Sequence, residues 1–391
     1  MFFAFVGLSF SIKFALLYAG SNGWYNYRHQ ADIFTIYNLL LNRGFTASTI
    51  KLIAYDDIAN DASNPFQGQI FHTTDHKTNV YPGSSAIDIK GDFCTAQSLY
   101  DSITNLPTTA GDKVFIYYDN HGGPGLLGVP SGCGDDILAP PLSQALTTAA
   151  DSNLWGQCLF LIEACYAGST AETFTAANLA TITAANNAES SYAAVYDSAV
   201  GAYLSNEFIN HFIALCDESP DIDVGTLYKS LKSKTTQSHV MYYGEESVKE
   251  TDLSEFIGIP NRVMKSTAVD NSKKVTPREA TEASLSFLAQ KHTQPSVRAH
   301  ARLTLLRLKT LTQKLDSVMD MLVRYLDAEN YHEIMNNKTA PYTPAYYRVL
   351  KAFTAKFGQV NPDDLDRFFI LKALTATHTE AEIIKAFDAV F

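Results

Sequence analysis

The feature that most constrains the fold is a short apolar run that ends beside a cysteine. Residues 159–162 are apolar throughout and lie between turn signals, which is typical of a strand in the interior of a parallel sheet. Cys165 follows this run, and residues 167–168 indicate the start of a loop or helix. In open α/β sheets, ligands bind and reactions occur at the carboxyl ends of the strands. The run therefore predicts an α/β sheet with Cys165 at its functional edge.

A second apolar run, residues 114–118, ends close to His121 and Gly122. A cysteine and a histidine at the carboxyl ends of two strands form the arrangement that a thiol nucleophile and its general base require. Taken singly, Cys165 is better interpreted as a buried apolar thiol and His121 as a turn residue. Their joint occurrence at two strand ends favours a catalytic pair.

Strands and helices alternate along most of the chain. We expect strands at residues 14–19, 50–55, 114–118, 159–162, 180–185 and 239–243, and helices at 28–43, 93–106, 138–155, 208–215 and 224–234. Residues 58–92 are predicted to form a long surface loop with short strands, and residues 190–207 a polar and aromatic loop. The alternation predicts a three-layer α/β sandwich with a mostly parallel sheet over residues 12–245.

The pattern changes after residue 245. Residues 246–275 are polar and without sustained periodicity, which indicates a linker, and residues 276–391 are helical throughout. Residues 299–326 carry a broad apolar stripe that is typical of a helix in a bundle, formed by Leu303, Leu305, Leu306, Leu308, Leu311, Leu315, Met319 and Leu322. The sequence therefore predicts an all-α C-terminal domain.

The charge is unevenly distributed between these parts. The net charge of −11 argues against a general nucleic-acid-binding protein. Residues 1–250 hold 11 Lys and Arg against 25 Asp and Glu, a net charge of −14, whereas residues 251–391 hold 19 against 16, a net charge of +3. We expect the acidic front part and the mildly basic C-terminal part to attract one another.

Cysteine usage excludes two further classes of protein. Five cysteines at irregular spacing do not form a disulfide framework. No CxxC pair or Cys/His cluster predicts a metal, and we expect no cofactor.

The N-terminus is apolar but short. Residues 1–11 lack a basic start and are interpreted as a signal peptide; the alternative is that they belong to the fold ahead of the first strand. No later segment reaches the roughly 18 apolar residues that a membrane span needs, so no membrane span is expected.

Four stretches together resemble the legumains, the asparaginyl endopeptidases of the caspase-like clan of cysteine peptidases. They are SNGWYNYRHQAD (21–32), DNHGGPG (119–125), IEACYAGS (162–169) and SSYAAVYD (190–197). The catalytic subunit of the glycosylphosphatidylinositol transamidase shares a similar NYRH block, but typically has Asp-Thr-Cys at the nucleophile and a C-terminal membrane span. The resemblance implies a caspase-like fold over residues 13–245 and an inhibitory prodomain over residues 276–391.

The resemblance also implies catalytic roles. Cys165 is the nucleophile and His121 the residue that transfers protons. Backbone N–H groups at Gly122 and Cys165 are natural donors to the oxyanion, because glycine allows the substrate carbonyl to approach closely. Asn26 matches the asparagine that orients the histidine, although a turn-capping role is an alternative.

Specificity residues follow from the same match. Arg28 and Glu163 correspond to residues that line the pocket for the asparagine before the scissile bond, and Ser190 and Ser191 to a third part of it. An asparagine side chain offers one acceptor and two donors, which a guanidinium and a carboxyl group complement. The alternatives are a salt bridge at a helix start for Arg28 and a buried pair for Glu163.

The chain departs from the family pattern at three places. The acidic pocket residue of legumains falls on Asn206, next to Glu207, which predicts weaker discrimination between asparagine and aspartate. The usual Asp before the catalytic histidine is Asn120, with Asp119 one place earlier. The helical tail contains no cysteine, so its bundle must be held by packing.

The sequence thus predicts a cysteine endopeptidase that cleaves after asparagine, and also aspartate, and that is made as an acid-activated zymogen. Alternatives are a peptide ligase acting on the same thioester, a transamidase-like subunit, or a non-enzymatic scaffold. Expected partners are protein or peptide substrates, the chain's own C-terminal prodomain and cystatin-type inhibitors, and the expected location is the secretory pathway, in a lysosome-like acidic compartment or outside the cell.

Two further expectations concern processing. Asn261 and Asn271 in the linker are candidate self-cleavage sites, and basic residues of the tail such as Arg298, Arg302 and Arg307 are expected to dock on acidic groups around the active site. Asn337-Lys338-Thr339 is a weak glycosylation signal.

Overall fold

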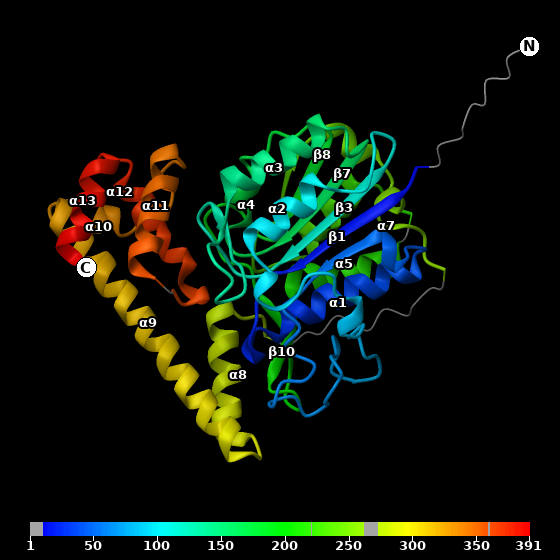
Figure 1. Cartoon of the computed structure of the whole chain (residues 1–391), viewed down its shortest axis with the longest axis horizontal. Helices are drawn as coiled ribbons and strands as arrows, with labels where there is room; N and C mark the ends of the chain where they lie inside the picture. The colour runs from blue at the N-terminus through cyan, green and yellow to red at the C-terminus, as the bar shows by residue number, and fades with distance from the viewer. Residues whose placement is uncertain (1–10, 220, 262–272, 359) are drawn as a thin grey trace, which may run out of the picture.

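A six-stranded, mostly parallel sheet forms the centre of the protein (Figure 1). The computed structural model describes residues 11–219, 221–261, 273–358 and 360–391, so the predicted signal peptide lies almost wholly outside the described residues. The strand order is β11-β8-β7-β3-β1-β2, and only β11 runs antiparallel to its neighbour. The strands are β1 (Lys13–Ala19), β2 (Ile50–Ile53), β3 (Lys113–Asp119), β7 (Gln157–Glu163), β8 (Leu179–Thr183) and β11 (Met241–Gly244). The predicted mostly parallel sheet is confirmed.

Helices cover both faces of this sheet, because apolar side chains point alternately to each face along the buried strands. In β1, Ala15 and Leu17 join the core beneath one layer, whereas Phe14 and Leu16 join the core beneath the other. The first layer contains α1 (Tyr27–Asn42), α5 (Glu207–Glu218) and α6 (Val224–Lys234); the second contains α2 (Ala96–Thr104), α3 (Ala139–Asp151) and α4 (Ala167–Ala171). The three-layer caspase-like sandwich is confirmed.

The segment 190–207, expected to be a loop, instead forms an antiparallel pair of strands, β9 (Ala193–Asp197) and β10 (Ala202–Asn206). Every residue of β10 is buried. One side of the pair lies against α1 and the other against the helical C-terminal part, where Tyr203 packs on Val275 and Ala280. Burial on both sides removes the polar–apolar alternation that identifies a strand in the sequence.

Two other loop regions also differ from expectation. Residues 58–92 contain the 3₁₀ helices η3 (Ser84–Ala86) and η4 (Gly91–Phe93) and isolated bridges instead of short strands. A small sheet that the sequence does not indicate follows His121, with strands β4 (Gly122–Gly123), β5 (Leu126–Leu127) and β6 (Ile137–Leu138).

The first part of the expected linker belongs to the α/β core. Residues 246–257 contain η5 (Glu246–Glu250) and α7 (Leu253–Ile257), and Leu253, Phe256 and Ile257 are fully buried next to β1 and β3. Asn261 donates from its backbone N–H to the Asn42 carbonyl at 2.8 Å, whereas Asn271 lies outside the described residues. The connection between the two parts is therefore shorter than the polar composition indicates.

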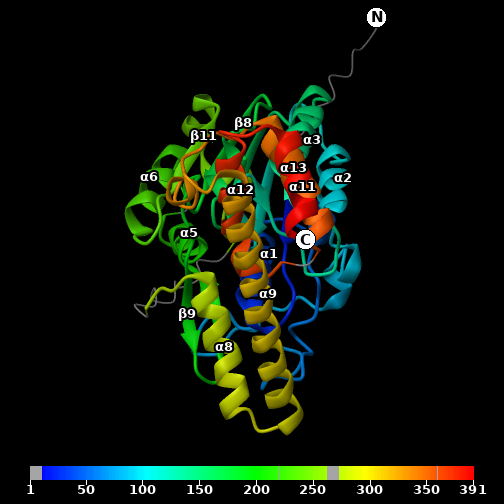
Figure 2. The same cartoon turned by 90° about the vertical axis from the view of Figure 1, so that its left-hand side faces the viewer.

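The C-terminal part is helical, as predicted (Figure 2). It begins with an antiparallel pair, α8 (Pro277–Lys291) and the long α9 (Pro295–Asp327). The remaining elements pack on the second half of α9: α10 (Tyr331–Ile334), α11 (Pro344–Phe357), η6 (Pro362–Phe368), α12 (Phe369–Leu374) and α13 (Glu380–Val390).

The apolar stripe predicted for α9 is narrower than expected in its first half. Leu315, Met319 and Leu322 are fully buried in the bundle, whereas Leu303 is 66% and Leu306 62% exposed. The first half of α9 packs chiefly on α8, and a single neighbour covers only one side of a helix. Within the described residues, no helix combines the length and the apolar character that crossing a membrane requires.

Candidate active site

Strand register brings Cys165 and His121 to the same edge of the sheet. Asp119 at the end of β3 is paired with Glu163 at the end of β7, and each candidate catalytic residue follows two positions after its paired residue. Tyr166 then adopts a left-handed conformation (φ 55°) and starts α4, so the chain turns sharply just after Cys165. The sheet topology alone thus places the predicted nucleophile beside the predicted base.

Asn26 and His121 are joined by a buried hydrogen bond. Asn26 Oδ1 lies 2.8 Å from His121 Nε2, and Asn26 Nδ2 donates to the Asn22 carbonyl at 2.9 Å, which fixes the orientation of the amide. Because Oδ1 can only accept, Nε2 carries the proton and Nδ1 is left with its lone pair. Asn26 makes no side-chain capping bond to α1, although it occupies the N-cap position. The geometry is that of an orienting residue and not of a turn cap.

His121 is neutral in this structure. Burial lowers its pKa well below the usual value, and the charge of Arg28 lowers it further. The ring of His29 packs edge-on against it, with 5.0 Å between the ring centroids. A neutral imidazole with a free lone pair is the form that accepts a thiol proton.

The Cys165 thiol is almost completely buried, with 6% exposed. The Ser191 backbone N–H donates to Sγ at 3.3 Å, and Ser191 Oγ lies 3.9 Å from it. Burial raises the pKa of Cys165 to about 11. The thiol is therefore protonated in the conformation described, and opening of the site to water is needed before it becomes reactive.

Gly122 lies directly against Cys165. A Cβ atom at this position would stand 2.3 Å from the Cys165 carbonyl oxygen, closer than any side chain tolerates. This explains why the residue after the histidine has no side chain.

Arg28 and Asn206 are brought together at the base of the predicted pocket. Arg28 is 1% exposed and donates from Nε to Asn206 Oδ1 at 2.9 Å. Its other hydrogen bond, from Nη1 to the Tyr25 carbonyl, is longer at 3.4 Å. Among the described residues, no carboxylate lies within ion-pair distance of Arg28, which argues against the helix-start salt bridge.

Two acidic residues that the sequence interpretation missed hold the other side of Asn206. Asn206 Nδ2 donates to Asp32 Oδ2 at 3.0 Å and to Asp119 Oδ1 at 3.1 Å. Burial raises the pKa of Asp32 to about 7 and that of Asp119 well above its usual value. A sequence signal existed for both, since Asp32 lies one helical turn after Arg28 and Asp119 ends the strand before His121.

Glu163 and Ser190 complete the predicted set. Glu163 Oε2 accepts from the Ile209 backbone N–H at 3.3 Å, while its buried Oε1 has no hydrogen-bond partner. Burial raises the pKa of Glu163 well above its usual value, and the charges of Asp119 and Asp32 raise it further. Ser190 borders the cavity next to Cys165.

The helical C-terminal part covers this site. A cavity of about 130 Å³ is bordered by His121, Gly122, Cys165 and Ser190 on one side and by Thr276, Pro277, Arg278, Pro362, Asp363 and Asp366 on the other. Asp363 Oδ1 lies 3.4 Å from His121 Nδ1, and the Leu365 carbonyl would be 2.5 Å from a Cβ atom at Gly123. η6 therefore packs directly on β4, the strand that follows His121.

The charged groups in this contact differ from those expected. Asp363 and Asp366 of η6 and Arg278 of α8 are the charged tail groups that border the cavity next to Cys165 and His121. Arg298 and Arg302 instead donate to carbonyl groups at the end of α8 and in the turn before α9, between 2.8 and 3.1 Å, and Arg307 lies near Tyr25. The net charge of each half thus predicted attraction, but not which groups face the site.

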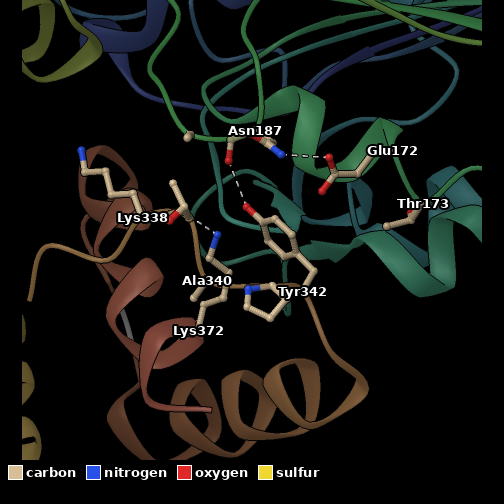
Figure 3. Close-up of a pocket in the computed structure, with 10 residues that line it drawn as sticks. Glu172, Thr173, Asn187, Lys338, Ala340, Tyr342 and Lys372 are labelled. Carbon is tan, nitrogen blue, oxygen red and sulfur yellow. Dashed lines mark hydrogen bonds between the residues drawn. The ribbon is translucent and has the colours of Figure 1, made fainter. Parts of the chain in front are cut away.

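A second and larger cavity, about 460 Å³, lies where the tail meets the catalytic part (Figure 3). Tyr342 donates its hydroxyl to the Asn187 carbonyl at 3.0 Å, and Asn187 donates to Glu172 at 2.9 Å. Lys372 donates to the Lys338 carbonyl at 2.9 Å. None of the residues that border this cavity belongs to the catalytic set, so it is a feature of the seam between the two parts.

Metal-binding and disulfide chemistry find no support in the part of the chain that the structure describes. It contains no group of three or more His, Cys, Asp or Glu side chains arranged to hold a metal ion. All five cysteines are free and buried.

Comparison with known families agrees with this geometry. The sequence model of the Peptidase C13 family matches residues 13–266. This chain belongs to the peptidase C13 family. The match ends close to the described end of the α/β part and includes every residue of the candidate site.

Three relatives illustrate the range of the C13 family that this chain resembles. Legumain of Mus musculus is 33% identical over 264 residues, covering 63% of this chain and 59% of the relative. Vacuolar-processing enzyme of Vicia sativa is 31% identical over 280 residues, covering 63% and 55%. Legumain of Bos taurus is 29% identical over 335 residues, covering 81% and 73%, so that alignment extends into the helical part. The chain thus matches only about three fifths of the length of several relatives.

Proposed function

We propose that this C13 family chain is a cysteine endopeptidase. The observation that supports it best is the buried hydrogen bond of 2.8 Å between Asn26 and His121, next to Cys165 on the adjoining strand end. An orienting amide, a neutral imidazole and a thiol are the three groups that thiol proteolysis needs.

The reaction begins when His121 Nδ1 takes the proton of the Cys165 thiol. The thiolate attacks the peptide carbonyl, and the backbone N–H groups of Gly122 and Cys165 stabilise the oxyanion. The C–N bond breaks as the imidazolium returns the proton to the departing amine. Water then attacks the thioester with His121 as base, which releases the acid and restores the thiol.

The specificity pocket is proposed to take an asparagine or aspartate side chain. Arg28 provides donors, and the free Oε1 of Glu163 either accepts or, when protonated, donates. A small side chain with a terminal amide or carboxyl group satisfies both.

We further propose that the enzyme is made as a zymogen whose residues 276–391 act as the inhibitory prodomain. The buried thiol, the cavity of about 130 Å³ and the contact of η6 with Gly123 support a site that is closed to substrates. The relation to a vacuolar-processing enzyme supports activation in an acidic compartment of the secretory pathway or after secretion.

The test is a pair of incubations of the full-length protein, at pH 7 and at pH 4.5, followed by mass and by cleavage of an asparagine-containing peptide. At pH 4.5 the wild-type chain should become shorter and should cleave the peptide. Cys165→Ser should do neither. A Cys133→Ala control, which removes a buried thiol away from the site, should behave as wild type. Turnover by Cys165→Ser equal to that of wild type contradicts the assignment.

A further inference from the structure

The hydrogen bonds of Asn206 link the cation of the pocket to a carboxyl group at the end of β3. Asn206 accepts from Arg28 Nε at 2.9 Å with Oδ1 and donates with Nδ2 to Asp119 Oδ1 at 3.1 Å and Asp32 Oδ2 at 3.0 Å. The amide oxygen and both N–H groups of Asn206 therefore have hydrogen-bond partners inside the protein. Asn206 thus contacts both Arg28 and Asp119.

An amide can flip, and the flip would change the pocket. With oxygen and nitrogen exchanged, two N–H donors would face the Arg28 guanidinium and the oxygen would face two carboxyl groups. Asp119 and Asp32 oppose that arrangement because each accepts one of the two Nδ2 hydrogens. All three residues are at most 3% exposed, so water cannot replace a lost partner.

We propose that Asp119 is a positioning residue of the specificity pocket, which holds the Asn206 amide so that its oxygen fixes the Arg28 guanidinium toward the substrate side chain. Asp119 does not touch the substrate. The proposal rests on the peptidase function proposed above, and it connects the amide at position 206 with the carboxyl group at position 119, which the sequence shows only as two separate departures from the family pattern.

The contact between Asp119 and Asn206 should also form when the carboxyl group and the amide exchange positions. Asn206→Asp alone places a carboxyl group against two others and removes both Nδ2 donors. Adding Asp119→Asn returns one N–H donor to the contact, while the carboxyl oxygen introduced at position 206 still accepts from Arg28. The exchanged pair should therefore recover part of what the single substitution loses, since the donor to Asp32 is not restored.

The experiment is a double-mutant cycle in the full-length protein. At pH 7, Asn206→Asp should lower the melting temperature by about 5 °C, and the exchange variant Asn206→Asp/Asp119→Asn should recover at least half of this loss. Asn206→Asp/Asp136→Asn is the matched control, because Asp136 is a half-buried carboxyl group that accepts from the Val129 backbone N–H and does not contact Asn206. The control pair should recover nothing. Additive effects in the exchange variant would overturn the contact on which the proposal stands.

Kinetics of the acid-activated protein separate positioning from structural damage. For an asparagine peptide, Asn206→Asp should raise KM about tenfold with kcat within about threefold of wild type, because Arg28 binds the side chain and not the reacting bond. The exchange variant should bring KM back to within about threefold. A fall in kcat with KM unchanged, or a KM that the exchange does not restore, would contradict the positioning role. Absence of turnover in wild type would contradict the peptidase function itself, while the melting cycle would still decide the contact between Asp119 and Asn206.

Discussion

At the scale of single residues, the site depends on hydrogen bonds that fix which atom of each side chain faces the reaction. Asn26 is held by the Asn22 carbonyl at 2.9 Å and itself orients His121. Gly122 is excluded from having a side chain by the Cys165 carbonyl. These restraints fix how the groups of the site are oriented. We expect their loss to lower the catalytic rate more than the free energy of unfolding.

Asn26→Ala tests the orienting bond. Without Oδ1, the imidazole of His121 loses its preference for the tautomer with the proton on Nε2, and we expect kcat of the activated protein to fall about 10- to 1000-fold. The measurement is the steady-state cleavage of an asparagine peptide. Asn22→Ala, which leaves Oδ1 of Asn26 in place, should cost less, and equal losses in the two variants would contradict the tautomer role.

At the scale of elements, the closed site depends on how α8 and η6 are joined. Arg278 of α8 forms an ion pair with Asp364 of η6, and Thr312 of α9 also donates to Asp364. Asp364 is fully buried, so its partners are needed to offset the loss of water around the carboxyl group. The contacts of Asp364 therefore hold α8, α9 and η6 together where they cover the candidate active site.

Arg278→Ala should weaken the contact between α8 and η6. Breaking a buried pair leaves an uncompensated carboxylate, which destabilises the contact by about 3–5 kcal/mol when both partners are buried, and by less here because the Arg278 side chain is 35% exposed. We expect alkylation of Cys165 in the full-length protein at pH 7 to become at least about fivefold faster, as followed by intact mass. Arg348→Ala removes a surface pair with Glu380 far along the tail and should leave the rate unchanged. A rate unchanged by Arg278→Ala as well would show that this pair does not hold the site closed.

At the scale of the whole molecule, two groups at the closed site respond to acid in opposite directions. Burial lowers the pKa of His121 well below its usual value, so a form in which water reaches the ring takes up a proton more readily and acid favours opening. Burial raises the pKa of Asp363 to about 6, so the closed form takes up a proton between about pH 6 and pH 4 and acid favours closing. Asp363 therefore opposes the opening in acid that we propose.

Asp363→Asn removes the carboxyl group whose protonation stabilises the closed form in acid. The closed form of this variant no longer gains stability between about pH 6 and pH 4, so opening should begin at higher pH, with the midpoint raised by about one unit. The measurement is the rate of Cys165 alkylation in full-length protein from pH 7.5 to pH 4. Glu380→Gln, a change at a half-buried carboxyl group of the same tail that pairs with Arg348, serves as control. If the pH midpoint of Cys165 alkylation is unchanged or lower in Asp363→Asn, Asp363 does not oppose opening.

The amino-acid sequence by itself determined the layers and the main strand ends of the sheet, and it supplied the candidate catalytic residues. Apolar runs that end at Cys165 and near His121 are local signals, and a parallel sheet brings all its carboxyl ends to one edge. The resemblance supplied Asn26, Arg28 and Glu163 residue by residue, and the structure brings them to that edge.

Only the tertiary structure decided which residues meet across long separations. The contacts of Asn206 with Asp119 and of His121 with Asp363 join positions 87 and 242 residues apart, and no periodicity encodes them. The strands β9 and β10 were hidden for the same reason, since a neighbour from the helical tail buries their second side. Net charge predicted that the two parts attract, but only the folded chain shows which charged groups meet. Asp363, Asp366 and Arg278 border the cavity at Cys165, whereas Arg298 and Arg302 bond to carbonyl groups within the tail.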